Sequence, residues 1–187
     1  MVTRRNIIKG GAAAAFFAPF AGFAVTGAAA QNGPLFRFGI VADPQYAPVV
    51  PSLKMSRYYA NSLWKLSDAI EAFNKEDLQF VATLGDIIDR HWESFSHILP
   101  LYDKLKHEHF FVLGNHDYDI AKEYLASVVR TVGMDRAYYD FTGGGYRFLV
   151  LDGNDVSPFA PPEGDPRREI AAARLDELKA RGAANAQ

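Results

Sequence analysis

The sequence contains no cysteine among its 187 residues, and this absence limits the chemistry that the protein can use. Disulfides and thiolate ligands are both excluded, so any metal ion must be held by oxygen and imidazole donors. The sequence also lacks a basic tract, because 20 Lys and Arg residues stand against 22 Asp and Glu residues. A nearly balanced charge predicts no nucleic-acid partner. Hydrophobic residues make up 49% of the chain, which is enough to bury the core of one domain.

The first thirty residues have a composition of their own. A basic start containing Arg4 and Arg5 is followed by an apolar run rich in Ala and Gly, and then by three alanines ending at Ala30. These are the three parts of an export signal, and the paired arginines resemble a twin-arginine signal. Pro19 and the small residues make the apolar run a poor membrane-spanning helix.

We therefore expect residues 1–30 to be a signal peptide that is cleaved after Ala30 and leaves no stable membrane span. Residues 31–187 are then an exported domain, periplasmic in a bacterium. An uncleaved N-terminal anchor is the alternative.

The rest of the chain alternates between short apolar runs, which are typical of buried strands, and segments with helical spacing. Strands are predicted at 35–42, 80–84 and 109–113, and a hairpin is predicted over 137–151 around three consecutive glycines. Helices are predicted over 54–74, 95–105, 120–132 and 167–181. Strands that alternate with helices favour an α/β fold with a largely parallel central sheet.

Polar side chains follow each of the three predicted strands directly. Asp43 follows the first strand, Asp86 the second, and Asn115 and His116 the third. The carboxyl ends of parallel strands lie at one edge of the sheet, where such folds bind ligands. A single strand ending in Asp is commonly followed by a helix that the Asp caps. Three strands ending in groups that can bind metal predict a functional site instead.

Three motifs carry these side chains, namely ADPQ at 42–45, GDIIDR at 85–90 and GNHD at 114–117. In order and in strand context they resemble the motifs of the calcineurin-like metallophosphoesterases, which read D-x-H, G-D-x-x-D and G-N-H-D or G-N-H-E. Gln45 stands where that family usually has histidine. Together with the segment RYYANSL at 57–63, this departure is similar to the manganese-dependent ADP-ribose/CDP-alcohol diphosphatase branch.

The resemblance implies a fold and a reaction. The fold is the N-terminal half of an αββα sandwich, with a mostly parallel sheet flanked by helices. The reaction is metal-dependent hydrolysis of a phosphoester or pyrophosphate bond in a small phosphorylated substrate, specifically a nucleotide diphosphate-linked one. A broad phosphomonoesterase or phosphodiesterase is the alternative.

The resemblance also implies a metal site. Two divalent ions would be held by Asp43, Gln45, Asp86 and Asn115, with Asp86 as the bridging carboxylate. An amide oxygen at Gln45 in place of an imidazole makes the donor set harder, which favours Mn²⁺ or Mg²⁺ over Zn²⁺. Manganese is the metal that we expect, with magnesium, iron and zinc as alternatives.

Two further motif residues would act on the substrate. His116 would contact the phosphoryl group or protonate the leaving group, and Asp89 would pair with His116 and fix its tautomer. Asp117 is interpreted as a structural residue that accepts hydrogen bonds. The four histidines outside the motifs are interpreted as structural residues as well.

Two motifs of the family have no counterpart in the sequence. They supply three imidazole ligands, and no histidine follows His116. We therefore expect the phosphoesterase domain to be incomplete at its C-terminus, as a fragment of a longer enzyme would be. One alternative is a short product that binds metal weakly and does not turn over. Another is a chain that needs a second chain to complete its site.

Overall fold

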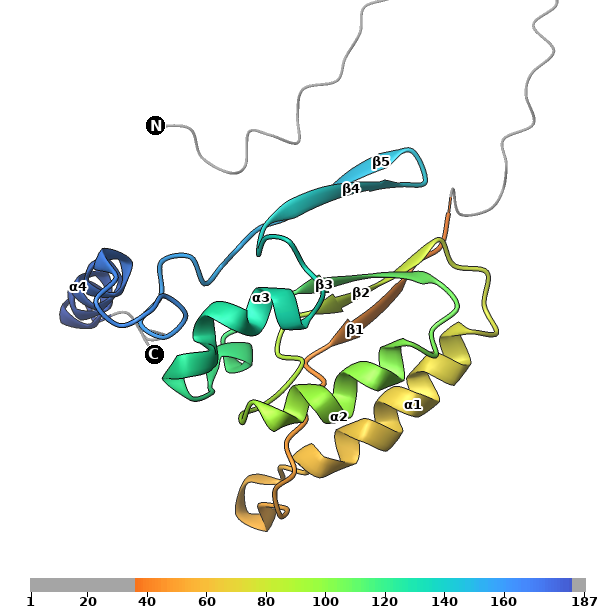
Figure 1. Cartoon of the computed structure of the whole chain (residues 1–187), viewed down its shortest axis with the longest axis horizontal. Helices are drawn as coiled ribbons and strands as arrows, with labels where there is room; N and C mark the ends of the chain where they lie inside the picture. Colours follow the sequence, from red (N-terminus) through yellow and green to blue (C-terminus); the bar gives the residue numbers. More distant parts are fainter. Residues whose placement is uncertain (1–35, 183–187) are drawn as a thin grey trace, which may run out of the picture. The chain divides into compact units, whose positions relative to one another are not determined.

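The computed structural model describes residues 36–182, so the expected signal peptide lies outside the described residues (Figure 1). Three strands form a parallel sheet in the order β1 (Gly39–Ala42), β2 (Phe80–Leu84), β3 (Glu108–Val112). Their register pairs Val81 with Gly39 on one side and with His109 on the other. The predicted α/β fold with a parallel sheet is confirmed. Within residues 36–182, no helix is both long enough and apolar enough to cross a membrane.

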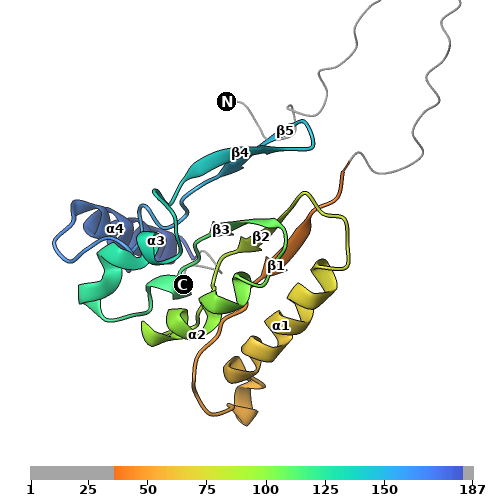
Figure 2. The ribbon, with the colours of Figure 1, turned by 45° about the vertical axis from the view of Figure 1, so that its right-hand side comes forward.

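Two helices, α1 (Ser62–Phe73) and α2 (Glu93–Tyr102), cover one face of this sheet (Figures 1 and 2). The helix predicted over 54–74 becomes α-helical only at Ser62. Short 3₁₀ turns at Leu53–Met55 and Tyr59–Asn61 precede it, and Ser56 between them has a left-handed φ of 52°. An α-helix cannot continue through such a residue. The predicted start of this helix at residue 54 was therefore wrong.

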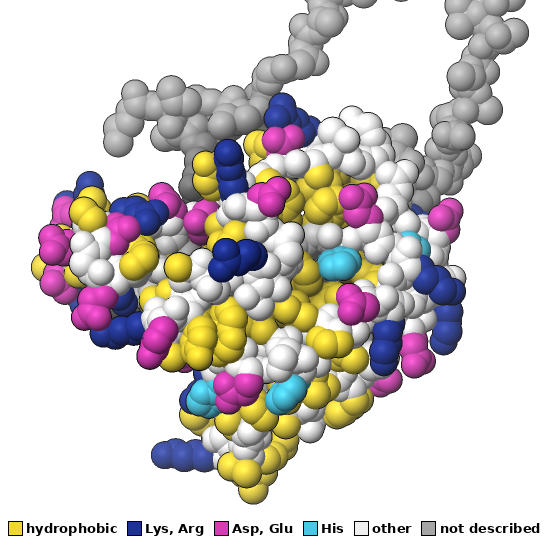
Figure 3. Space-filling model, viewed as in Figure 1, with side chains coloured by type: hydrophobic (Ala, Val, Ile, Leu, Met, Phe, Trp, Pro, Cys, Tyr) yellow, Lys and Arg dark blue, Asp and Glu magenta, His cyan; other side chains and the backbone are white. Residues whose placement is uncertain are grey.

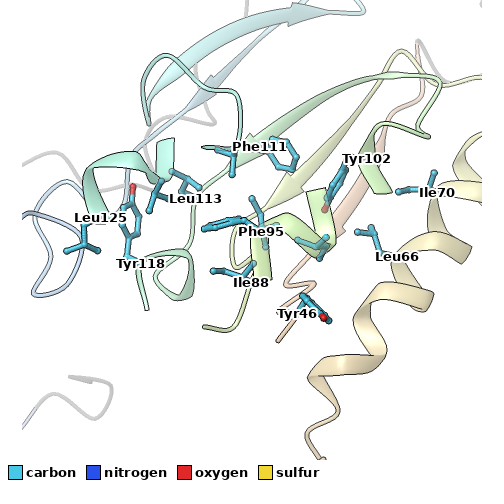
Figure 4. Close-up of a cluster of buried hydrophobic side chains, with 14 residues drawn as sticks. Tyr46, Leu66, Ile70, Ile88, Phe95, Tyr102, Phe111, Leu113, Tyr118 and Leu125 are labelled. Carbon is cyan, nitrogen blue, oxygen red and sulfur yellow. The ribbon is translucent and has the colours of Figure 1, made fainter. Parts of the chain in front are cut away.

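The core lies between the sheet and these helices (Figure 4). Side chains alternate between the two faces of a strand, so Val81, Thr83 and Phe111 point toward the helices. There they meet Phe95 and other fully buried side chains of α1 and α2. Each large apolar side chain buried in this way contributes about 1.5–3 kcal/mol. The hydroxyl of Thr83 donates to the Tyr102 hydroxyl at 3.1 Å, which satisfies the polar pair inside this core.

The third predicted helix is shorter than expected. A 3₁₀ segment (Lys122–Ser127) leads into the short helix α3 (Val128–Thr131), which ends before Gly133 with its left-handed φ of 77°. The last helix, α4 (Pro166–Ala180), agrees closely with the prediction. Its Asp165 side chain caps the N-terminus by accepting a hydrogen bond from the Arg167 backbone N–H.

The predicted hairpin is present as β4 (Tyr139–Gly143) paired with β5 (Tyr146–Val150). Gly144 and Gly145 form its turn, and both have the positive φ that this turn requires. The hairpin lies on the face of the three-stranded sheet that is opposite the helices (Figures 1 and 2). Ring contacts hold it there: Phe141 and Phe148 each lie 5.0 Å from Phe80 between ring centroids.

Candidate metal site

The three motif loops extend the strand pairing beyond the carboxyl ends of the strands. The Gln45 backbone N–H donates to the Asp86 carbonyl at 2.8 Å, and the Gly85 N–H donates to the Val112 carbonyl at 3.0 Å. These bonds fix the loop after β1 to the loop after β2, and the start of the β2 loop to the end of β3. The motifs therefore meet at one edge of the sheet.

The Asp86 carboxylate lies at the centre of this edge and is buried. Its Oδ2 accepts a hydrogen bond from the Gln45 amide at 3.2 Å, and its Oδ1 accepts one from the His116 backbone N–H at 3.0 Å. One carboxylate thus touches both the first and the third motif. Rotation of the Gln45 amide by half a turn would direct its oxygen toward a cation held by Asp86.

The backbone at this edge is strained. Asp43, Gln45 and Asp86 have left-handed φ angles of 48°, 45° and 47°. Non-glycine residues in such sparsely populated regions cost about 1–3 kcal/mol each, and they gather at active and ligand-binding sites. Three of the four predicted metal ligands therefore hold a conformation that packing alone would not favour.

The fourth predicted ligand, Asn115, is exposed at the same edge, as is Asp43. The donor set is then two carboxylates and two amide oxygens, which suits Mn²⁺ or Mg²⁺. Four donors are fewer than two six-coordinate ions need. Within the described part of the chain there is no group of three or more His, Asp or Glu side chains placed to hold a metal ion. The described residues therefore supply part of the ligand set of a site for hard divalent cations such as Mn²⁺ or Mg²⁺.

His116 lies beside Asp89, though the contact differs from the prediction. Its Nδ1 is 3.0 Å from the Asp89 main-chain carbonyl oxygen and 3.6 Å from the carboxylate Oδ1. The carbonyl can only accept, so Nδ1 carries the proton and donates it to this bond. This arrangement fixes the tautomer as expected, but through the backbone, and it leaves Nε2 for a substrate.

The Asp89 carboxylate is fully buried and binds other partners. Its Oδ2 accepts from the Arg90 guanidinium Nε at 2.5 Å, whereas Oδ1 has no hydrogen-bond partner within residues 36–182. Burial raises the pKa of the Tyr59 hydroxyl, and the nearby Asp89 carboxylate raises it further. The Arg90 guanidinium lies 5.9 Å from the Tyr59 ring centroid. The sequence prediction missed Tyr59, because nothing in its spacing separates it from a packing aromatic.

Asp117 ties the second and third motifs together. Its Oδ1 accepts from the Ile88 backbone N–H at 3.1 Å, and its Oδ2 accepts from the Gly114 N–H at 2.9 Å. The side chain is completely buried. Burial raises its pKa from the ordinary 3.8 to about 7, while the two backbone bonds oppose this rise. The interpretation of Asp117 as a hydrogen-bonding residue agrees with these contacts.

Three of the four histidines outside the motifs have side-chain contacts that suit structural roles. His97 Nδ1 lies 3.0 Å from the Tyr46 hydroxyl, and His107 Nε2 lies 3.0 Å from the Phe73 carbonyl oxygen. His109 is partly buried and stacks on the Tyr102 ring, and this burial lowers its pKa.

A further positioning residue escaped the sequence prediction. The buried Asn154 side chain donates to the Leu113 carbonyl, directly before the third motif.

Comparison with known proteins decides the family. The model of the calcineurin-like phosphoesterases matches residues 36–178, which includes all three motifs. The chain belongs to this family. The predicted resemblance is confirmed, whereas the roles of the individual site residues remain predictions.

Several curated relatives bear the name manganese-dependent ADP-ribose/CDP-alcohol diphosphatase. The protein from Arabidopsis thaliana is 38% identical over 167 residues, which cover 82% of this chain and 53% of the relative. The rice protein is 34% identical, with 80% and 50% covered. A crystal structure described as a dimetal phosphatase from Danio rerio superposes with a TM-score of 0.64 at 27% identity, covering 78% of this chain and 52% of its own. The chain spans about half the length of the relatives that it matches.

Gly114 provides a test of how tightly Asp86 is held. A Cβ at Gly114 would lie 2.1 Å from Asp86 Oδ1 and 2.4 Å from its backbone nitrogen. We expect Gly114→Ala to displace the carboxylate, to lower Mn²⁺ affinity by about tenfold or more, and to lower the free energy of unfolding by about 1–3 kcal/mol. Gly153→Ala is the matched control, because nothing lies within 4 Å of its added Cβ. Calorimetric Mn²⁺ titration and urea unfolding measure both effects, and wild-type Mn²⁺ affinity in Gly114→Ala would contradict this account.

Asp117 gives a pH test on the metal-free protein. Its folded-state pKa of about 7 lies above the ordinary 3.8, so the folded state binds the proton more tightly. The contribution of Asp117 to stability is therefore greatest below pH 3.8 and is lost as the pH rises through about 7. Asp117→Asn should abolish this slope. It should also lower the free energy of unfolding by about 1–3 kcal/mol, because one buried N–H loses its acceptor.

Urea unfolding at a series of pH values measures this slope. Asp176→Asn, an exposed position on α4, is the control and should keep the wild-type profile. Equal slopes for wild type and Asp117→Asn between pH 3.8 and 7 would show that Asp117 is not the titrating group.

Proposed function

We propose that this protein takes part in metal-dependent hydrolysis of a pyrophosphate or phosphoester bond, with Mn²⁺ as the metal and a nucleotide diphosphate-linked compound as the substrate. One observation carries the proposal. The Asp86 carboxylate contacts the first and third motifs at an edge where three predicted ligands share a strained backbone. Such strain persists only where the surrounding structure over-determines it, and it gathers at active and ligand-binding sites.

The names of the relatives support the choice of metal and substrate. They describe manganese-dependent diphosphatases for ADP-ribose and CDP-alcohols, and the zebrafish structure is described as a dimetal phosphatase. All these names describe enzymes, which favours an enzymatic role over an inactive half-domain. The hard oxygen donors of the site independently favour manganese over zinc.

In this proposal Asp43, Gln45, Asp86 and Asn115 would hold the metal ions. When bound, divalent ions polarise the phosphoryl group and neutralise the charge that develops on its oxygens. Asp86 suits a bridging position because both of its oxygens face the site, one toward the first motif and one toward the third.

His116 acts on the substrate. The bond from its Nδ1 to the Asp89 carbonyl fixes the ring and leaves Nε2 to donate a hydrogen bond to a phosphoryl oxygen or a proton to the leaving oxygen. The buried Asp89 carboxylate lies beside the same ring nitrogen, with its Oδ1 3.6 Å from Nδ1. The Arg90 guanidinium holds this carboxylate in place by donating to its Oδ2.

Export is part of the same proposal. The paired Arg4 and Arg5, the apolar run and the small residues before Gln31 support a twin-arginine signal that directs the protein to the periplasm.

Two substitutions separate metal binding from catalysis. Asp86→Ala should lose bound Mn²⁺, measured by metal analysis after gel filtration, together with any hydrolysis of ADP-ribose. His116→Ala should keep its Mn²⁺ and lower the rate of hydrolysis by about 10²–10⁴-fold, as expected for the loss of a general acid. Product chromatography measures the rates.

His107→Ala is the control, because His107 precedes β3 and therefore lies at the opposite end of the strand from His116. It should change neither metal content nor rate. Loss of Mn²⁺ from His116→Ala would contradict the role given to His116. Faster hydrolysis of p-nitrophenyl phosphate than of ADP-ribose would contradict the proposed substrate class.

A further inference from the structure

The segment that leads from the first motif to α1 carries several exposed apolar side chains. Val50 is 87% exposed, Leu53 77% and Met55 66%. Val50 and Leu53 are the two most exposed large hydrophobic residues in the described part of the chain. Tyr58 and Trp64, farther along the same segment, are exposed as well. Apolar side chains that gather in this way at the surface mark a site of interaction with a protein or a membrane.

Backbone hydrogen bonds give this loop, residues 50–58, a defined shape. Ser52 and Arg57 exchange two of them, N–H to carbonyl, at 2.9 and 3.0 Å. Between these two residues the chain reverses through the 3₁₀ turn Leu53–Met55 and the left-handed Ser56. Turns are usually built from Gly, Asn, Asp, Ser and Pro. Leucine and methionine at the tip of the 50–58 loop are therefore not required by the turn itself.

The charged side chains of the same segment are all basic. Lys54, Arg57 and Lys65 are exposed, and no Asp or Glu occurs between residues 44 and 67. The chain as a whole has a formal net charge of −2, so this distribution is local. The Lys65 ammonium group lies 5.8 Å from the ring centroid of Trp64. The exposed apolar side chains are thus accompanied by positive charge alone.

The 50–58 loop protrudes at one end of the molecule. It lies beyond the N-terminal end of α1, at the lower end of the views in Figures 1 and 2 and away from the hairpin. Hydrophobic side chains cover this end in the space-filling view, with a basic side chain beside them (Figure 3). A protruding apolar tip of this kind can enter a soft surface.

We propose that the 50–58 loop docks the protein on a membrane surface that contains anionic lipids. The apolar side chains at its tip would enter the boundary between headgroups and acyl chains, as interfacial segments do. The basic side chains beside them would remain among the negatively charged headgroups. Tyr58 and Trp64 suit the same interface, because Tyr and Trp side chains gather at the level of the headgroups. Docking of this kind requires no helix that spans the membrane.

The composition of the tip favours a lipid surface over a protein partner. Lysine is depleted in interfaces between proteins. In the 50–58 loop, however, Lys54 stands at the tip itself, directly between Leu53 and Met55. This alternation of apolar and basic side chains fits a surface that is negatively charged outside and apolar inside.

The 50–58 loop is joined to the metal site at both ends. It begins five residues after Gln45 and leads directly into Tyr59, whose ring centroid lies 5.9 Å from the Arg90 guanidinium. A docked tip would therefore fix the position of the metal site relative to the lipid surface. This inference concerns location and does not depend on the proposed reaction.

The absence of cysteine allows a local test on the full chain. Met55→Cys is labelled with an environment-sensitive fluorophore, and labelled Leu178→Cys on α4 is the matched control, because Leu178 is also exposed. Vesicles contain either equal parts of phosphatidylglycerol and phosphatidylcholine or phosphatidylcholine alone. With the anionic vesicles we expect the label at residue 55 to shift its emission to the blue and to be quenched by brominated acyl chains. The label at residue 178 should show neither change.

The contribution of charge is measured by vesicle titration of labelled Met55→Cys. Lys54→Glu in this background should weaken binding by about fivefold or more. Lys179→Glu, which reverses an exposed lysine on α4, is the matched control and should leave binding unchanged. Raising the salt concentration from about 0.1 M to about 1 M shortens the Debye length from about 10 Å to about 3 Å and should also weaken binding.

The proposal is overturned if the label at residue 55 does not respond to vesicles, or if the labels at residues 55 and 178 respond equally. Equal affinity for neutral and anionic vesicles would overturn it too. A response at residue 55 without lipid would assign the tip to another occupant. That occupant is the substrate if ADP-ribose with Mn²⁺ produces the response, and a second copy of this chain if concentrating the protein does. Hydrolysis is not measured, so failure of the proposed reaction would not affect the result.

Discussion

The structure of the site depends on one carboxylate. Asp86 accepts from Gln45 on one oxygen and from the His116 backbone on the other, so it connects motifs that are 41 and 30 residues away in the chain. It can do so only because Gly114 leaves its Cβ position empty. The fully buried Asp117 connects the same loops by accepting hydrogen bonds from two of their backbone N–H groups. A strained backbone and a buried acid are stable here because each supports the other.

The two faces of the central sheet are buried to different extents. The helix-facing side is closed by α1 and α2, with Phe95 and Ile98 fully buried, and this side supplies most of the apolar burial. The opposite side has the composition of a core, but the hairpin covers only part of it. The loops of the site stand at the boundary between the closed face and the open one.

Much of this arrangement could be predicted from the sequence. Strand β2 was predicted with its observed bounds and the hairpin to within two residues, because β-branched and aromatic runs ending at glycine identify strands. The placement of Asp43, Asp86 and Asn115 directly after three neighbouring parallel strands followed from the predicted topology. The beginning of α1 could not be predicted, since the left-handed turn at Ser56 leaves no trace in helical spacing. The contact of His116 with a backbone carbonyl could not be predicted either, because main-chain acceptors carry no sequence signal.

The central claim is the proposal that the edge around Asp86 binds manganese. Crystals grown with Mn²⁺ and measured at the manganese absorption edge test it most directly. The account predicts anomalous density for manganese at this edge, in contact with the Asp86 carboxylate. Absence of anomalous density at this edge, or manganese bound without contact to Asp86, would contradict it.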